Sequence, residues 1–165
     1  MTEVFDLARL DPDHDLSAFG CGHEELDRWL RDNALRAQRQ SSARVWVLTE
    51  PGKPRVLGYV AIAPTVVERD DLPGRLAGGL SRVPAYLIGK LAVDRSIHGR
   101  GMGRQLLRKA LENILAAAAA SGGRVVVVDA IDATASAFYV RHGFVPVAGS
   151  HRLALLIQDV QASGG

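Results

Sequence analysis

The chain has 165 residues, of which 47% are hydrophobic and 23% charged, and its formal net charge is +2. A chain of this length can bury a substantial core, and we expect residues 1–165 to form a single domain. No apolar run approaches the roughly 18 residues of a membrane helix, and residues 1–6 lack the basic and apolar pattern of a signal peptide. The single cysteine, Cys21, excludes an internal disulfide. We therefore expect a cytoplasmic protein without a membrane partner.

The first part of the chain predicts a strand and an amphipathic helix. Residues 5–10 alternate weakly and predict the strand, which ends at the proline within residues 11–13. Residues 23–40 predict the helix, because one set of side chains recurs at a spacing of three or four: Leu26, Trp29, Leu30, Asn33, Ala34 and Ala37. The opposite face of this helix presents guanidinium groups to solvent, from Arg28, Arg31 and Arg39.

The rest of the chain alternates strands and helices. Two β-rich runs, 44–49 and 56–63, are joined by a turn sequence with two prolines and a glycine, and predict a hairpin. Residues 66–84 are predicted to be irregular, because they contain Pro-Gly and Gly-Gly pairs, and connections of this length are often functional. The remaining segments predict strands over 85–93, 124–129 and 151–157, and helices over 102–119 and 133–142. This order predicts an α/β domain built on a mixed sheet.

A glycine-rich loop joins the strand at 85–93 to the helix at 102–119. Glycines let the backbone turn tightly and approach a ligand closely. The unpaired N–H groups and the positive end of the helix dipole meet where the helix begins, so a phosphate or pyrophosphate is the natural ligand. Two arginines add charge-assisted donors there. The candidate ligand-binding residues are His98, Gly99, Arg100, Gly101, Met102, Gly103 and Arg104.

Two common phosphate motifs do not fit this loop. A dinucleotide-binding G-x-G-x-x-G motif fails, because Leu106 stands where its third glycine is needed. A Walker A motif fails because the chain has no Gly-Lys-Ser or Gly-Lys-Thr sequence. A glycine-rich turn without a ligand remains the simpler alternative.

The loop resembles the acyl-CoA-binding loop of the GNAT acyltransferase superfamily, usually written Q/R-x-x-G-x-G/A. The resemblance rests on Leu91-Ala92-Val93-Asp94 and His98-Gly99-Arg100-Gly101-Met102-Gly103, with His98 in place of the usual Gln or Arg. A second motif of the family is matched by Val128-Asp129-Ala130 and Ala137-Phe138-Tyr139-Val140-Arg141-His142-Gly143-Phe144. The resemblance implies the GNAT fold, a mixed sheet flanked by helices, and acetyl-CoA as cosubstrate.

A narrower resemblance reaches the N-terminus. Phe19-Gly20-Cys21-Gly22 and Leu26-Asp27-Arg28-Trp29-Leu30 are similar to the opening of the GNAT toxins of bacterial toxin–antitoxin pairs, which are TacT-like and acetylate the amino group of aminoacyl-tRNA. The resemblance covers residues 5–158. It implies an aminoacyl-tRNA substrate, a ribbon-helix-helix antitoxin, contact with operator DNA only through the antitoxin complex, and a homodimer.

The resemblance also implies roles for single residues. The pantetheine arm would lie along Leu91, Ala92 and Val93, and Tyr139 would be the general acid for the departing thiolate. A phenol pKa of about 10 exceeds a thiol pKa of about 8.5, so the site must favour the phenolate or supply further donors. The alternative for Tyr139 is a core aromatic. Asp132 stands where many members contact the cofactor, and a helix N-cap is the equally simple interpretation.

The sequence leaves open which amine is acetylated and whether the basic residues bind tRNA. An α-amine has a pKa near 7.7–8.0 and needs little help to lose its proton, which favours it over a lysine amine. Arg28, Arg31 and Arg39, with Lys90 as a weaker candidate, either contact tRNA phosphates or form a solvated face. Cys21 and His23 lack a third partner, so we expect no metal site.

Two other functions compete with the tRNA-acetylating toxin. One is a GNAT enzyme that acetylates a small amine or a protein N-terminus without binding nucleic acid. The other is a non-catalytic subunit that binds CoA and regulates a partner, which the presence of Tyr139 argues against.

Overall fold

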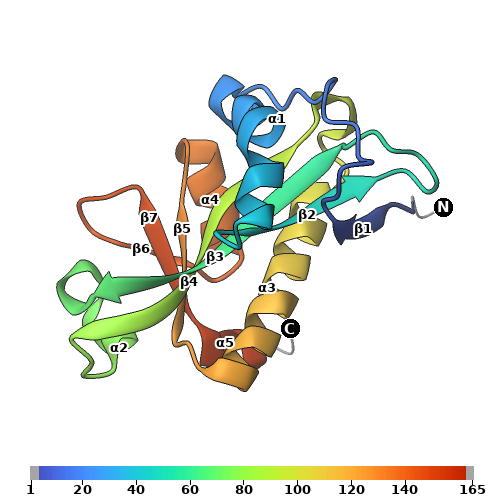
Figure 1. The fold of residues 1–165 in the computed structure, drawn as a ribbon. Helices are drawn as coiled ribbons and strands as arrows, with labels where there is room; N and C mark the ends of the chain where they lie inside the picture. The colour runs from blue at the N-terminus through green and yellow to red at the C-terminus, as the bar shows by residue number, and fades with distance from the viewer. Residues whose placement is uncertain (1–3, 163–165) are drawn as a thin grey trace. The chain divides into compact units, whose positions relative to one another are not determined.

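In a computed structural model, which describes residues 4–162, the chain forms two compact units (Figure 1). The first comprises Met1–Ile62 and Lys90–Ala110, and the second comprises Ala63–Gly89 and Leu111–Gly165. Three elements pass through both units: β3 (Gly58–Glu68), β4 (Arg82–Val93) and α3 (Met102–Ser121).

The strands form a seven-stranded mixed sheet in the order β1-β2-β3-β4-β5-β7-β6. The strands not yet given are β1 (Asp6–Arg9), β2 (Arg44–Thr49), β5 (Val125–Asp129), β6 (Val145–Pro146) and β7 (Arg152–Leu156). β4 and β5 are parallel, whereas β1–β2, β2–β3, β5–β7 and β6–β7 are antiparallel. This confirms the predicted α/β fold on a mixed sheet and the predicted hairpin of β2 and β3.

The core of the first unit lies between α1 (Glu24–Arg39) and the sheet. α1 lies next to β2 (Figure 1), and its buried residues Leu30 and Ala34 belong to the same cluster as those of β2. β2 alternates, so that Val45 and Val47 are fully buried in the cluster that also holds Leu30 and Tyr59. Burying a side chain such as Leu30 contributes about 1.5–3 kcal/mol, so this cluster is what holds α1 in place.

The core of the second unit centres on β5. Val125, Val126, Val127 and Val128 have no exposed surface. β5 is paired on one side with β4 and on the other with β7, and a strand inside a sheet that is covered on both faces has a continuous apolar sequence. Arg124, just before β5, donates from Nε to the carbonyl of Leu76 near the end of α2 (Gly74–Ala77), 2.7 Å away.

The prediction that residues 66–84 are irregular was wrong at both ends of the segment. β3 continues through Glu68 and β4 begins at Arg82, with a 3-10 turn, η1 (Arg69–Asp71), and α2 between them. The extension of β3 follows the period of a strand, since Val66 is 50% exposed and Val67 only 3%. Two short elements were not predicted, β6 and α5 (Ile157–Ala162), because two to six residues carry too little periodicity.

Candidate functional site

The glycine-rich loop of the first unit follows directly from β4. Asp94 caps the 3-10 turn η2 (Arg95–Ile97) by accepting from the amide of Ser96. The backbone then passes through Gly99 at φ +80° and Gly101 at φ +76°, which a residue with a Cβ adopts only at a cost. A Cβ at either glycine would meet nothing within 4 Å, so the loop needs glycine for its backbone conformation and leaves the adjacent space open.

The N-terminus of α3 presents its amides at the end of this loop. The amide of Gln105 makes the first bond of the helix, to the carbonyl of Gly101 at 3.3 Å. The amides of Met102, Gly103 and Arg104 therefore have no acceptor within the helix. α3 is 20 residues long, so its dipole adds a partial positive charge here. The loop backbone and these amides fit a pyrophosphate, and the exposed side chains of Arg100 and Arg104 flank them.

The end of β4 carries the residues expected to lie along the pantetheine arm. The register of β4 with β5 runs from Ala85 to Ile88, and β4 continues beyond it to Val93. Ala92 is buried, whereas Leu91 and Val93 are half-buried. His98 Nε2 lies 2.6 Å from the carbonyl oxygen of Val93, so the ring that replaces the family's Gln or Arg ties the loop to the strand.

Tyr139 lies in the second unit, on α4 (Ala133–Arg141). Its side chain is 6% exposed and makes edge contacts with Phe138 and Phe144 at centroid distances of 5.2 and 5.5 Å. Burial raises the pKa of Tyr139 well above that of a free phenol. A phenol with a raised pKa stays protonated at neutral pH and can donate its proton. Asp132 is the N-cap of α4 and accepts from the amide of Ala135 at 2.8 Å, as the N-cap interpretation predicted.

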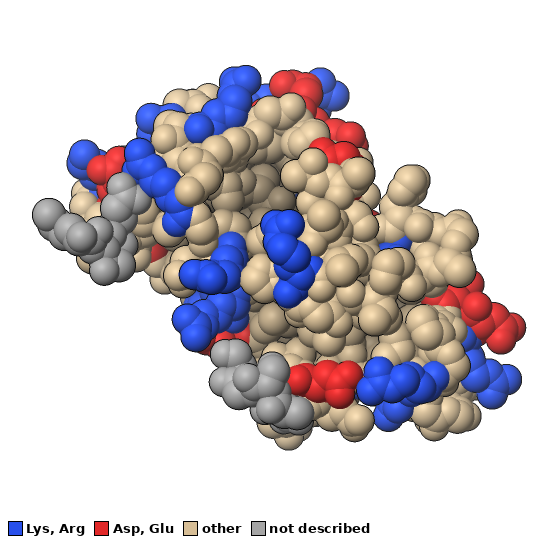
Figure 2. Space-filling model, turned by 180° about the vertical axis from the view of Figure 1, so that it is seen from behind, with Lys and Arg blue, Asp and Glu red and all other residues tan. Residues whose placement is uncertain are grey.

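The three arginines of α1 do not share one environment. Arg28 and Arg31 both approach Oε1 of Glu24, at 3.6 and 3.4 Å. Arg31 lies on the exposed face of the helix, as predicted, and it also donates to the carbonyl of Phe19 at 3.4 Å, a contact that the sequence did not predict. Arg28 and Arg39 are exposed. On the face in Figure 2 the Lys and Arg side chains form several separate groups rather than one continuous patch.

Lys90, the weaker candidate, belongs to an aromatic stack. Its Nζ lies 5.8 Å from the ring centroid of Trp29, and Trp29 is stacked on Tyr59 at 5.9 Å with an interplanar angle of 10°. The half-buried ammonium therefore has a defined position beside β4, where a cation–π contact stabilises it by about 0.5–2 kcal/mol.

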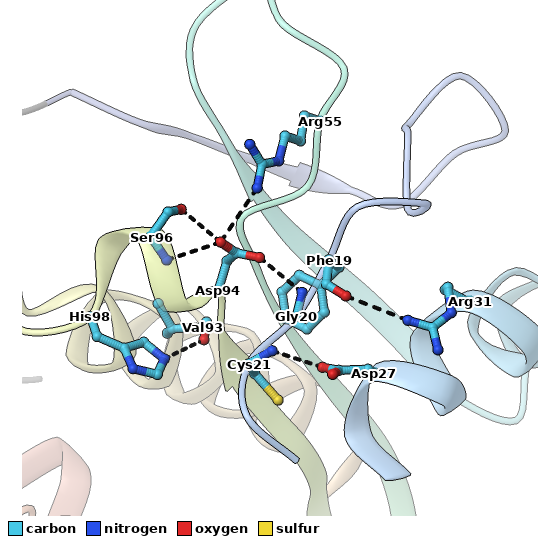
Figure 3. A network of polar contacts seen from close by, with 10 residues as sticks. All are labelled: Phe19, Gly20, Cys21, Asp27, Arg31, Arg55, Val93, Asp94, Ser96 and His98. Carbon is cyan, nitrogen blue, oxygen red and sulfur yellow. Dashed lines mark hydrogen bonds and ion pairs between the residues drawn. The ribbon is translucent and has the colours of Figure 1, made fainter. Parts of the chain in front are cut away.

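Asp94 is the residue that sequence reasoning missed (Figure 3). It is 4% exposed and accepts from the amide of Gly20 at 2.9 Å and from the amide and hydroxyl of Ser96 at 3.0 and 2.6 Å. Burial alone would raise the pKa of Asp94, but these bonds and the nearby Arg55 outweigh burial and lower it. Gly20 and Asp94 are 74 positions apart, and no periodic pattern connects positions so distant.

Cys21 is a buried free thiol just before α1. Cys21 Sγ donates to the backbone carbonyl of His23 at 3.6 Å, and burial together with the hydrogen bond to Asp27 raises the pKa of the thiol to about 11. Within residues 4–162, no three His, Cys, Asp or Glu side chains are grouped to hold a metal. No helix in the same range is long and apolar enough to cross a membrane.

Comparison with known proteins gives the family. The model of the acetyltransferase (GNAT) domain family matches residues 41–146. A tRNA-acetylating toxin of Mycobacterium tuberculosis is 36% identical over 93% of each chain. A probable toxin TacT of Sinorhizobium fredii is 31% identical over 84% of this chain and 82% of its own.

Solved structures of toxins show the same fold. AtaT complexed with acetyl-methionyl-tRNAfMet superposes with a TM-score of 0.90 at 28% identity, covering 98% of this chain and 100% of its own. A tyrosine-to-phenylalanine variant of AtaT, bound to the C-terminus of the antitoxin AtaR and to acetyl-CoA, has a TM-score of 0.85 at 27% identity and covers 97% and 98%. The AtaT–AtaR complex bound to DNA has a TM-score of 0.81 at 27% identity and covers 97% and 99%. The chain belongs to the GNAT acetyltransferase family, and its relatives within that family include a tRNA-acetylating toxin.

Proposed function

We propose that this enzyme is the toxin of a toxin–antitoxin pair, which transfers an acetyl group from acetyl-CoA to the α-amino group of aminoacyl-tRNA and thereby blocks translation. The observation that carries the proposal is the 36% identity over 93% of both chains with a tRNA-acetylating toxin. The open glycine loop at the start of α3 supports it independently, because its chemistry suits a pyrophosphate. The family match to residues 41–146 includes parts of both compact units, which supports their working as one domain.

The residues of the first unit would bind the cosubstrate. Amides at the start of α3, with the loop residues from His98 to Arg104, would hold the pyrophosphate. Leu91, Ala92 and Val93 would supply main-chain hydrogen bonds to the pantetheine arm, and Asp132 of the second unit is a further candidate contact. Bound acetyl-CoA supplies an acetyl thioester, whose carbonyl carbon accepts the substrate amine and whose thiolate leaves.

Tyr139 would donate a proton to the leaving thiolate. Its buried phenol remains protonated at neutral pH because burial raises its pKa. The raised pKa also makes the proton harder to release to a thiolate, so the transfer requires the site to favour the phenolate or to supply further donors to the leaving thiolate. A positioned acid of this kind contributes about 10²–10⁴ in rate.

The acceptor amine needs no strong base. The α-amine of an esterified amino acid loses its proton far more readily than a lysine side chain, whose pKa is about 10.4. A fraction of the α-amine is therefore neutral at physiological pH and can attack directly. Exposed Arg28 and Arg39 on α1 are the proposed contacts for tRNA phosphates, with Lys90 on β4 as a weaker candidate.

The partners follow from the same relatives. AtaT is bound by the antitoxin AtaR, and the AtaT–AtaR complex binds DNA. We extend this to a ribbon-helix-helix antitoxin for the present enzyme, with operator DNA bound only through that complex, and to a homodimeric toxin. Its substrate would be charged tRNA, so its place of action would be the cytoplasm.

Inhibition of cell-free translation tests this function. Wild-type enzyme with acetyl-CoA should stop synthesis of a reporter, and freshly charged tRNA added after removal of the enzyme should restore it. The Tyr139→Phe variant should leave synthesis running. If wild-type enzyme acetylates small amines or peptide N-termini but never slows translation, the enzyme is a GNAT with a different acceptor.

A further inference from the structure

Three residues before α1, Phe19–Cys21, are held by hydrogen bonds of their backbone, and we name them the strap. Figure 3 shows the bonds that join the Phe19 carbonyl to Arg31, the Gly20 amide to Asp94 and the Cys21 amide to Asp27. The carbonyl of Phe19 accepts from Arg31 at 3.4 Å, and the amide of Cys21 donates to Asp27 at 2.9 Å. Both partners lie on α1. Between them, the amide of Gly20 donates to Asp94 at 2.9 Å, and its carbonyl accepts from the amide of Arg95, also at 2.9 Å. The strap therefore joins α1 to the turn that begins the glycine loop.

The two carboxylates at the strap are buried. Asp27 is 7% exposed and Asp94 is 4% exposed, and Thr49 is the only other polar residue that is buried within the part of the chain described. Removing a carboxylate from water is unfavourable unless hydrogen bonds replace its hydration. An apolar residue would fill either position without that cost, so the acidic groups serve to fix a backbone conformation rather than to fill the core.

Asp94 holds two segments with its two carboxylate oxygens. Oδ1 accepts from the strap, and Oδ2 accepts from the amide and hydroxyl of Ser96 and from Arg55 at 3.5 Å. The same turn leads four residues later to His98, whose ring contacts the carbonyl of Val93 just before Asp94. The beginning of the loop is thus fixed from the strap, from within the turn and from β4.

There is little freedom for the strap to shift. A Cβ on Gly20 would lie 3.3 Å from the guanidinium of Arg95, so the strap backbone is close-packed against that side chain. Phe19 is 3% exposed and makes an edge contact with Tyr59 at 5.6 Å. Movement of α1 would displace the strap and, through Asp94, the start of the loop.

We infer that Asp94 is a positioning residue for the acyl-CoA loop, and that the strap makes acetyl-CoA affinity depend on Asp27 and Arg31 of α1. The inference rests on the proposed function only in taking acetyl-CoA as the ligand of the loop. Arg31 is thereby assigned to acetyl-CoA binding. Arg28, which contacts the same Glu24, remains a candidate contact for tRNA phosphates.

Titration of purified variants with acetyl-CoA in the absence of tRNA tests Asp94. Asp94→Ala should raise the Kd by about tenfold, corresponding to about 1.4 kcal/mol. Asp94→Asn should raise it by about threefold, since its remaining oxygen keeps one of the bonds. At saturating acetyl-CoA the kcat of both should stay within about twofold of wild type, so the effect falls on KM. Val47→Ala, in the buried cluster that also holds Phe19 and Cys21 of the strap, is the stability control: its Tm should fall and its Kd should not change.

A pair of arginine variants tests the α1 end of the strap. Arg31→Met should raise the Kd for acetyl-CoA by about threefold, although the residue lies on the helix and not in the loop. Arg28→Met is the matched control, because it removes the same kind of contact to Glu24 but does not reach the strap, and its Kd should equal that of wild type.

Two results would overturn the inference. One is that the Asp94→Ala variant keeps the wild-type Kd while its Tm falls as far as that of Val47→Ala. Asp94 would then stabilise only the fold. The other is an equal Kd for Arg31→Met and Arg28→Met. The two arginine variants change exposed residues, so we expect them to fold and to test the inference even if Asp94→Ala does not fold. Since no tRNA is present in the titrations, an error in the proposed acceptor would leave these results unaffected.

Discussion

The ring of His98 lies against the carbonyl of Val93, with 2.6 Å between Nε2 and the carbonyl oxygen. This contact closes the glycine loop back onto the end of β4. His98→Leu should therefore weaken acetyl-CoA binding by about fivefold, the effect of removing one hydrogen bond. His98→Gln should bind nearly as well as wild type, because the amide can donate to the same carbonyl. Calorimetric titration measures both, and equal weakening by Leu and Gln would show that the contact does not order the loop.

Gly101 is needed for its positive φ. Gly101→Ala should cost about 1–2 kcal/mol of strain, and the loop should relieve that strain by moving, so acetyl-CoA affinity should fall by at least about tenfold. Gly101→Val should abolish binding. Gly52→Ala is the matched control, since Gly52 has φ +73° and equally open surroundings but lies in the turn between β2 and β3. If both alanine variants bind acetyl-CoA like wild type, the loop does not hold the pyrophosphate.

Tyr139→Phe removes the proposed acid without changing the packing. Its kcat should fall by about 10²–10⁴ while the Kd for acetyl-CoA stays constant. Tyr86→Phe is the control in the same unit, because it removes a hydroxyl bonded to the carbonyl of Gly122 and should keep full activity. Wild-type turnover in Tyr139→Phe would exclude the tyrosine from the mechanism.

The raised pKa of Tyr139 sets the alkaline side of the pH profile. An acid catalyst works while it is protonated, and a phenol whose pKa lies above its ordinary value of about 10 stays protonated to higher pH. Activity should therefore rise with pH as the substrate α-amine loses its proton, and should not fall again below about pH 10. A profile of kcat against pH that declines between pH 8 and about 9 would contradict this assignment.

Much of the fold could be predicted from local patterns, and much of the site could not. The valines of β5 and the glycines at 99 and 101 indicate a buried strand and a tight loop through composition alone. Asp94 carries no comparable pattern, because its partner Gly20 is distant in sequence and contributes only a backbone amide. The contact of Arg31 with the carbonyl of Phe19 could not be predicted for the same reason. Helical periodicity gives the direction of a side chain, but not which carbonyl from another segment lies within its reach.

The basic face of α1 predicts a salt-dependent tRNA affinity. Arg28→Glu combined with Arg39→Glu should raise KM for charged tRNA and leave the acetyl-CoA Kd unchanged. Because the double variant can no longer neutralise two phosphates, the slope of log K against log salt should become shallower by about 2. Arg82→Glu makes the same kind of charge change on β4, where Arg82 is paired with Glu68, and should leave the slope unaltered. An unchanged slope in the double variant would make α1 a solvated face.

The central claim is that the acceptor is the α-amino group of an amino acid esterified to tRNA. Its most direct measurement is mass spectrometry of aminoacyl-adenosine released by nuclease from total charged tRNA after incubation with isotopically labelled acetyl-CoA. The account predicts one labelled acetyl group on the amino nitrogen of at least one aminoacyl-adenosine with wild-type enzyme, and none with Tyr139→Phe. Aminoacyl-adenosines without label, from wild-type enzyme that does acetylate free amines, would contradict it.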